Sequence, residues 1–324
     1  MSSSSSGIPG EVSVDWADDS ASIAPERLFD LKINNRMFEA SLAEDPSFPG
    51  TMSFAVGKDM VAKSMKGCVV VTYDTDTQVT AAQLEYFGYD PNCASKEPLP
   101  PSGSKSMLIG SLLAFRELAP SYVKTLYLND ESNFRCEDHP SVVRTILASL
   151  FLTGKSYYQR LLGVAPTEQT FAKLIPVLRK MNEVIPRDGA DSFWTKIIEG
   201  KKEDRAWLES NRAVIHECLT GKTWRRAVVA IHARLGCMFF ACAHDQLADL
   251  FGTDGLMGSS WKVDLADIPE SCNGNKVDFS VEESVMTGGG RSKYMADVRA
   301  AAKAVMRRRA GLSKARLIRK YRRA

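Results

Sequence analysis

Six histidine and cysteine residues fall within a short stretch of the sequence, at His216, Cys218, His232, Cys237, Cys242 and His244. Imidazole and thiolate are preferred zinc ligands, but structural zinc sites usually contain a C-x₂-C pair, and this sequence has none. The stretch has the apolar pattern of continuous buried helix, where cysteine packs as a small hydrophobe. Between a metal site and ordinary core side chains we favour core side chains, and we predict no metal.

Two Gly-Lys-hydroxyl triplets, Gly154-Lys155-Ser156 and Gly221-Lys222-Thr223, could suggest a phosphate-binding P-loop. That loop needs a further glycine five residues before the triplet's own glycine. Ser149 and His216 occupy those positions, and each triplet follows a predicted helix rather than a strand. The pattern instead predicts two helix–turn–helix connections, in which glycine ends one helix and Ser or Thr caps the next.

A second candidate phosphate site is the loop Pro101-Ser102-Gly103-Ser104-Lys105-Ser106. It leads from a predicted strand into a predicted helix, and a helix N-terminus with small residues favours an anion. An ordinary serine-capped helix start would look the same. On these residues alone the second interpretation is favoured.

The elements around this loop alternate between strand and helix. Strands are predicted at 67–73 and 82–87, and the proline-rich segment 90–106 must be a loop. Apolar residues at helical spacing predict a helix at 105–118; a short strand at 123–128 and a helix at 141–152 follow. This order predicts an α/β fold with a mixed sheet and flanking helices.

The rest of the chain divides by composition. We expect a disordered lead at 1–25, rich in Ser, Asp and Gly, and an α/β core at 26–165. A helical region at 166–251 has predicted helices at 171–185, 203–219 and 223–251. A Gly- and Asp-rich linker is expected at 252–290, followed by a basic helical tail at 291–324.

The tail concentrates positive charge. The last 34 residues hold 13 Lys and Arg against one acid, Asp297, so they carry a net charge of +12 while the preceding residues carry −9. The expected polyanion-binding residues are Arg307, Arg308, Arg309, Lys314, Arg316, Arg319, Lys320, Arg322 and Arg323. Nucleic acid or an acidic protein is the favoured partner, an anionic membrane surface and a merely solvated tail being the alternatives. With few aromatic residues, the tail offers no sequence-specific readout.

Cysteine use and hydropathy indicate the compartment. Seven scattered cysteines without paired motifs predict free thiols, including Cys68, Cys237 and Cys242, in an intracellular, reducing compartment. The N-terminus has no signal-peptide pattern. The most apolar stretch, 227–243, contains His232 and Arg234 and is too short for a membrane span. Composition, with 44% hydrophobic and 25% charged residues, is that of a globular protein.

The order of elements also resembles a known family. Strand 82–87, the loop, helix 105–118, strand 123–128, helix 141–152 and the segment Tyr157-Tyr158-Gln159-Arg160-Leu161-Leu162-Gly163 resemble the core of GNAT acyltransferases. Residues 84–163 further resemble uncharacterised GNAT-like proteins of large DNA viruses. The resemblance covers about 100 of 324 residues. It implies a GNAT-like sheet that binds acetyl-CoA, and a viral, virion-associated setting with other virion components as partners.

The resemblance assigns roles to particular residues. Gly103, Ser104, Lys105 and Ser106 would meet the coenzyme A pyrophosphate. Glu85 would be the strand-borne base, and Tyr157 or Tyr158 the acid that protonates the departing thiolate. The family's loop usually carries two or three glycines after an arginine or glutamine, whereas here Gly103 stands alone behind Pro100-Pro101.

Two functions of different class follow. The first is a binding or structural protein with a GNAT-like, degenerate core and a polyanion-binding tail. The second is a working acyl-CoA-dependent N-acyltransferase. Acetyl-CoA binding would discriminate between them, and it is the cofactor expected if the core is active.

Overall fold

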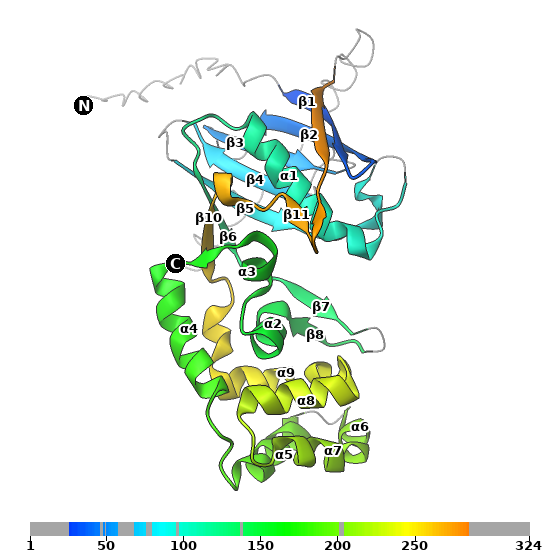
Figure 1. The fold of residues 1–324 in the computed structure, drawn as a ribbon, viewed down its shortest axis with the longest axis vertical. Coiled ribbons are helices and arrows are strands. Elements are labelled where there is room, and N and C mark those ends of the chain that lie inside the picture. The colour runs from blue at the N-terminus through cyan, green and yellow to red at the C-terminus, as the bar shows by residue number, and fades with distance from the viewer. Residues whose placement is uncertain are drawn as a thin grey trace, which may run out of the picture.

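The structure, a computed structural model, describes residues 26–45, 48, 50–57, 68–75, 80–94, 97–136, 139–200 and 204–284. Figure 1 shows a sheet with one helix lying across it, and a group of helices gathered at one side of the sheet. The predicted lead at 1–25 and the predicted tail at 291–324 lie outside the described residues, so both stay predictions.

Nine strands form the main sheet, in the order β13-β1-β2-β3-β4-β5-β6-β10-β9. Neighbours are antiparallel except β5 and β6, which run parallel. The strands are β1 (Arg27–Ile33), β2 (Arg36–Glu44), β3 (Thr51–Val56), β4 (Val69–Asp74), β5 (Ala81–Phe87), β6 (Thr125–Asn129), β9 (Ala165–Pro166), β10 (Ser260–Asp264) and β13 (Phe279–Glu283). The predicted α/β class with a mixed sheet is confirmed.

The first hairpin is set by its turn. Asn34 and Asn35 join β1 to β2, with φ of 46° and 65°. Both values lie in the left-handed region, which asparagine tolerates better than other residues with a side chain. The two asparagines are the signal for the hairpin.

The parallel pair is joined by helix α1 (Ser104–Leu118), which contacts β1, β4 and β13. Phe115 of this helix meets Phe54 and Tyr73 of the sheet, with ring centroids 5.7 and 5.9 Å apart. Gly110 lets the helix lie close to β1, since a Cβ there would stand 2.7 Å from Ile33 Cγ2. The predicted helix at 105–118 and the flanking strands are confirmed.

The region between β6 and β10 holds the remaining helices. They are α2 (Thr145–Thr153), α3 (Tyr157–Leu162), α4 (Glu168–Met181), α5 (Gly189–Gly200), α6 (Arg205–Ser210), α7 (Arg212–Leu219), α8 (Trp224–Leu235) and α9 (Met238–Phe251). A small ribbon of β7 (Asn133–Arg135) and β8 (Val142–Arg144) precedes them. We call residues 130–259 the helical lobe. Its buried side chains and those of the sheet belong to one contiguous core.

Both predicted helix–turn–helix connections are confirmed. Gly154 ends α2 with φ of 75°, and Ser156 then caps α3 in a reciprocal capping box with Gln159. In the second copy Gly221 has φ of 68°, and the Thr223 side chain accepts from the backbone N–H of Arg226 at the start of α8. The shared residues are therefore explained by capping rather than by phosphate binding.

Two predictions about the second half of the chain are wrong. The predicted continuous helix at 223–251 is broken between α8 and α9, where Gly236 has φ of 65°. The predicted linker at 252–290 contains, within its described part, the sheet strands β10 and β13. Strand β10 alternates buried Trp261 and Val263 with more exposed neighbours, which a short strand beside β6 requires.

Cysteine pairing also differs from the prediction. Cys68 is bonded to Cys93, and Cys136 to Cys237, so Cys68 and Cys237 are not free thiols. Cys242 is a buried cysteine outside these disulfides, as predicted. The compartment itself stays a prediction. Among the described residues, no helix has both the length and the hydrophobicity to cross a bilayer.

Candidate functional site

A cavity of about 860 Å³ lies where the parallel strands end. The last residues of β5, the residues after β6 and Ser104 at the start of α1 line it, and the helical lobe supplies Phe134, Thr145, Tyr157 and Tyr158. In sheets of this kind the carboxyl ends of parallel strands, next to the following helix, are where ligands bind. The fold therefore places the cavity at the position expected for a ligand site.

The cavity lies where the two strands stop pairing. Pairing between β5 and β6 runs from Ala81 with Thr125 to Leu84 with Leu128 and ends there. On its other side, β5 shifts register against β4, where Val71 pairs with Leu84 but Val70 with Tyr86. Glu85 is the extra residue at this irregularity. A bulge redirects the side chains around it, and here it lies at the cavity wall.

The structure brings the three predicted catalytic residues together. Glu85, Tyr157 and Tyr158 come from different elements, β5 and α3, and all line the cavity. Glu85 is exposed, and its Oε1 accepts a hydrogen bond of 3.0 Å from Thr72 Oγ1 on β4. The tyrosine rings meet edge to face, with centroids 5.3 Å apart. The Glu85 carboxylate is thus exposed to solvent and oriented by Thr72, while Tyr157 and Tyr158 are more buried.

Burial sets the ionisation of the two tyrosines. Desolvation raises the pKa of Tyr157 to about 12, and the charges of Cys272 and Asp130 add to the effect while Arg160 opposes it. Tyr158 is only 5% exposed, and desolvation together with Asp130 raises its pKa further. Both phenols therefore stay protonated at neutral pH and can donate hydrogen bonds into the cavity.

Asp130, which directly follows β6, was not among the residues predicted from the sequence. This carboxyl is fully buried, and its Oδ1 accepts from the hydroxyl of Ser132 at 2.5 Å and from the backbone N–H of Ser132 at 3.3 Å. Its Oδ2 has no hydrogen-bond partner within the described structure. Burial raises the pKa of Asp130, against the lowering effect of the Ser132 bonds. A buried acid beside a ligand cavity often has a functional role.

The predicted cofactor loop is only partly at the cavity. Ser104 lines it, whereas Gly103, Lys105 and Ser106 do not. The backbone N–H of Gly103 donates to the carbonyl of Pro100 at 2.8 Å, so this amide is already engaged. Helix α1 follows the short 3-10 turn Pro101–Gly103, and no side chain caps it by hydrogen bond. The start of α1 thus reaches the cavity through one serine.

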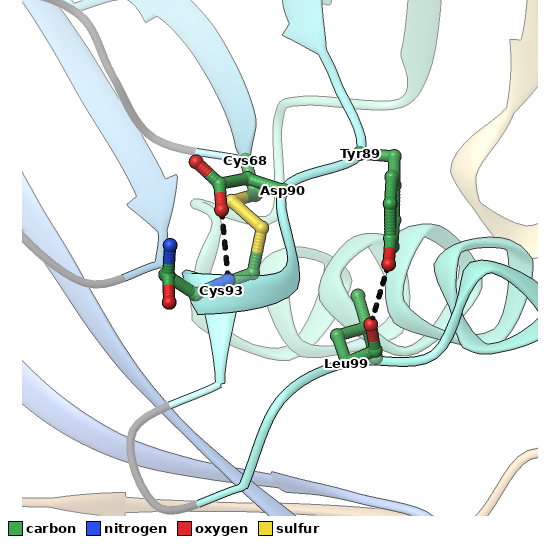
Figure 2. Close-up of a disulfide and its surroundings, with 6 residues drawn as sticks. Cys68, Tyr89, Asp90, Cys93 and Leu99 are labelled. Atoms are coloured by element: carbon green, nitrogen blue, oxygen red, sulfur yellow. Dashed lines mark hydrogen bonds between the residues drawn. A yellow bond between two sulfur atoms is a disulfide. The ribbon is translucent and has the colours of Figure 1, made fainter.

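A disulfide holds the segment that leads into α1. Figure 2 shows Cys68, at the start of β4, bonded to Cys93 in the 3-10 turn Pro91–Cys93. Asp90 caps that turn, accepting from the backbone N–H of Asn92 at 2.8 Å. Further along, the hydroxyl of Tyr89 donates to the carbonyl of Leu99 at 2.8 Å. These bonds fix both ends of the loop that joins the cavity wall to α1.

The lining of the cavity is aromatic and acidic. Its acidic side chains are Glu85 and Glu131, and its described lining contains no Lys or Arg. The aromatic side chains are Tyr86, Phe87, Tyr89, Phe134, Tyr157 and Tyr158. Tyr86 and Tyr89 are 48% and 45% exposed. Carboxylates and aromatic faces together attract a cation. Within the described lining, the part that favours an anion is the N-terminus of α1 at Ser104.

The six histidines and cysteines between 216 and 244 do not form one site. His216 packs against Trp194 with ring centroids 5.5 Å apart, and Nδ1 lies 3.7 Å from Asp191. His232 packs against Phe240 at 5.5 Å, and Cys237 is in a disulfide. Cys242 instead lies beside residues from other parts of the chain. The predicted polyanion-binding arginines and lysines lie outside the described residues.

Comparisons with known proteins add no family to this geometry: no family model, no curated protein and no solved structure matches the chain.

Proposed function

We propose that the cavity binds an acyl thioester such as acetyl-CoA and that the protein transfers the acyl group to a cationic amine. The observation that supports this most directly is the joint position of Glu85 and Tyr157 in one cavity, at the ends of the parallel strands. A thioester can extend between the separated strands, and its anionic end can reach the N-terminus of α1 beside Ser104. The proposal also rests on the resemblance to GNAT acyltransferases.

The acceptor follows from the charge of the lining. Glu85 and Glu131 attract an ammonium group, and the aromatic side chains offer faces on which it can rest. To react, the amine must lose a proton. Glu85 is placed to accept that proton because Thr72 orients its carboxylate by a 3.0 Å hydrogen bond. The neutral amine then attacks the thioester carbonyl, a C–N bond forms and the C–S bond breaks.

The tyrosines serve this step as hydrogen-bond donors. A thiol has a pKa near 8.5, whereas that of Tyr157 is raised to about 12. Full proton transfer from Tyr157 to a thiolate would be uphill by about 3.5 pKa units, or about 5 kcal/mol. A hydrogen bond from the phenol stabilises the departing thiolate without that cost. The thiolate then takes a proton either from solvent or from Glu85, which holds the proton that the amine released.

Calorimetry with acetyl-CoA tests the binding step on the full-length protein at moderate salt. We expect saturable binding that is weakened by filling the cavity with Ser104→Trp. Transfer is then measured as thiol release with a diamine acceptor. Glu85→Gln should lower the rate by 10²- to 10⁴-fold, the range for loss of a general base, and Tyr157→Phe by less. Glu39→Gln is the matched control, an exposed glutamate on β2 outside the cavity.

The outcomes separate the two classes of function. Absence of acetyl-CoA binding overturns the proposal. Binding without thiol release overturns the transfer and leaves a degenerate core that only holds the ligand. An equal loss of rate in Glu39→Gln and Glu85→Gln removes the role assigned to Glu85.

A second candidate function rests on the distribution of charge. The segregation of a net +12 in the last 34 residues favours binding of nucleic acid or an acidic protein, as a virion-associated protein would need. Binding of a DNA duplex should fall steeply with salt and disappear when residues 291–324 are deleted. Unchanged DNA binding by that truncated protein overturns this second proposal, and it leaves the cavity proposal intact.

A further inference from the structure

Three side chains with metal-binding groups meet in the helical lobe, outside the cavity. His139 lies between β7 and β8, Asp204 directly precedes α6, and Cys242 is in α9. One ligand atom from each lies within 4.8 Å of the others. We call His139, Asp204 and Cys242 the triad. Its members come from segments up to about 100 positions apart in the chain, so the tertiary fold brings them together.

The triad is buried. The side chain of His139 is 8% exposed and that of Asp204 is 11% exposed, while Cys242 is fully buried. His139 Nε2 lies 2.7 Å from Asp204 Oδ1, and the backbone N–H of Ser141 donates to His139 Nδ1 at 3.1 Å. Since Nδ1 accepts a hydrogen bond, the ring proton is on Nε2 and is shared with the carboxylate. The imidazole is thereby held in one orientation.

A covalent bond joins two of the segments that carry the triad. The backbone N–H of His139 donates to the carbonyl of Cys136 at 3.1 Å, so both residues belong to one turn. Cys136 is bonded to Cys237, the N-cap residue of α9, which carries Cys242. The disulfide therefore holds the His139 turn against the helix of Cys242. Preorganised ligands lose less conformational entropy when they bind a metal ion.

We propose that the triad binds a zinc ion, with a water molecule as fourth ligand. One imidazole, one carboxylate and one thiolate are all accepted zinc ligands, and three protein ligands leave one open position. The thiolate argues against magnesium and calcium, which take oxygen ligands. This site is independent of the acyl transfer proposed above, because none of its three residues lines the cavity.

The required movement is small. Ligand atoms at about 2.0–2.3 Å from a tetrahedral zinc ion lie about 3.3–3.6 Å from one another. The 2.7 Å distance between His139 Nε2 and Asp204 Oδ1 must therefore lengthen by about 0.6 Å. The other distances between ligand atoms are at most 4.8 Å, so they must shorten by at most about 1.2–1.5 Å. Side-chain rotations supply shifts of this size.

Proton balance gives the site a measurable signature. Zinc takes the place of the proton on His139 Nε2, and that proton moves to Nδ1, where it ends the contact with the Ser141 N–H. The Cys242 thiol loses its proton to solvent, and Asp204 binds as the carboxylate. One proton is released for each zinc ion bound when the triad starts as neutral imidazole, carboxylate and thiol.

Cobalt is the probe, because thiolate-bound cobalt absorbs in the near ultraviolet and tetrahedral cobalt in the visible. The full-length protein without a histidine tag is titrated with CoCl₂ and then with ZnCl₂ as competitor. We expect one equivalent of cobalt bound, a thiolate charge-transfer band, displacement by zinc, and release of one proton by calorimetry in buffers of different ionisation enthalpy.

Matched variants identify the ligands. Cys242→Ser should abolish the thiolate band, whereas Cys218→Ser, a buried cysteine in α7 that is also outside the disulfides, should keep it. His139→Gln should weaken zinc binding by more than 100-fold, beyond the 10- to 100-fold typical of an outer-shell residue. His232→Gln should leave the affinity unchanged.

The proposal stays testable even where a variant does not fold. The unmutated protein alone overturns it if it binds no cobalt at one equivalent or shows no thiolate band. A band that persists in a folded Cys242→Ser variant also overturns it, since the thiolate then comes from another cysteine. Asp204→Asn, a nearly isosteric change, supplies a further variant: it should lower zinc affinity at least 10-fold, and unchanged affinity removes Asp204 from the site.

Discussion

Removal of the Cys68–Cys93 disulfide should loosen both the protein and its cavity. The bond joins the start of β4 to the turn after β5 across 25 positions of sequence. In the chain-entropy treatment, a loop of that length costs about 11.7 cal/mol/K in the unfolded state, or about 3.5 kcal/mol at 25 °C. The double change Cys68→Ala and Cys93→Ala should therefore lower the free energy of unfolding by about 3.5 kcal/mol, plus the packing lost with the two sulfur atoms.

Urea unfolding without reductant measures this loss, followed by tryptophan fluorescence. The matched control is Cys218→Ala with Cys272→Ala, since both cysteines are buried and neither is in a disulfide. The control loses only sulfur packing, so the difference between the two double variants isolates loop closure. The same disulfide holds the segment that leads to α1, so acetyl-CoA affinity should fall in the first variant. The control for affinity is Cys218→Ala alone, because Cys272 interacts with Tyr157 of the cavity.

Two results would refute this reasoning. Dithiothreitol must first be shown to reduce the Cys68–Cys93 bond and to leave the Cys136–Cys237 bond intact. If the unmutated protein then unfolds at the same urea concentration with and without dithiothreitol, the Cys68–Cys93 bond does not constrain the unfolded chain. If the control variant loses as much stability as the disulfide variant, the loss comes from packing and not from loop closure.

Three further changes probe other parts of the fold, each by urea unfolding. Gly110→Ala should destabilise by up to about 2 kcal/mol, because overpacking against Ile33 costs about 1–3 kcal/mol while helix propensity returns about 1 kcal/mol; stabilisation instead would show that α1 has room at this position. Ser156→Ala should lower the free energy of unfolding by about 1 kcal/mol through loss of the capping box. Unchanged stability would show that the capping box does not stabilise α3. Burial raises the pKa of Asp130, so its contribution to stability is present at low pH and is lost as pH rises through the raised value. Asp130→Asn should therefore gain stability relative to the unmutated protein between pH 4 and pH 8, and parallel pH profiles would contradict this.

Local signals in the sequence predicted local structure well. The helix at 105–118 was readable because its apolar residues recur at helical spacing after a proline-rich loop, and α1 begins at Ser104. The paired glycine and Ser or Thr positions predicted the caps at Gly154 and Gly221, and both glycines are left-handed. These features depend on a few neighbouring residues, so one sequence contains the necessary information.

Features that depend on distant pairing were not readable. β13 pairs with β1, with Phe29 opposite Glu283, and no local pattern in 279–283 identifies that partner. β10 was predicted as linker because the strand has only five residues and the segment around it is rich in glycine and aspartate. Trp261 was the available signal, since a large aromatic residue that alternates with polar neighbours is typical of a strand with one buried face.

The candidate site shows the same division. Glu85, Tyr157 and Tyr158 were singled out by the family resemblance, and all three line one cavity. Asp130 was missed, because a lone aspartate after a strand has no sequence signature for burial. The triad was missed for a related reason: Cys242 was compared with histidines near it in sequence, whereas its partners His139 and Asp204 lie in other segments.

The strand order has a consequence for synthesis on the ribosome. β1 is the first described strand to emerge, yet one of its two neighbours is β13, which is the last. The helical lobe and strands β2 to β6 can fold while β1 still has one open edge, and an open edge is a template for pairing with another chain. Nascent copies on the same message are thus exposed to mispairing until residue 283 has left the exit tunnel. A chaperone that covers this edge would protect it during that interval, and slow translation over the preceding segment would lengthen the exposure.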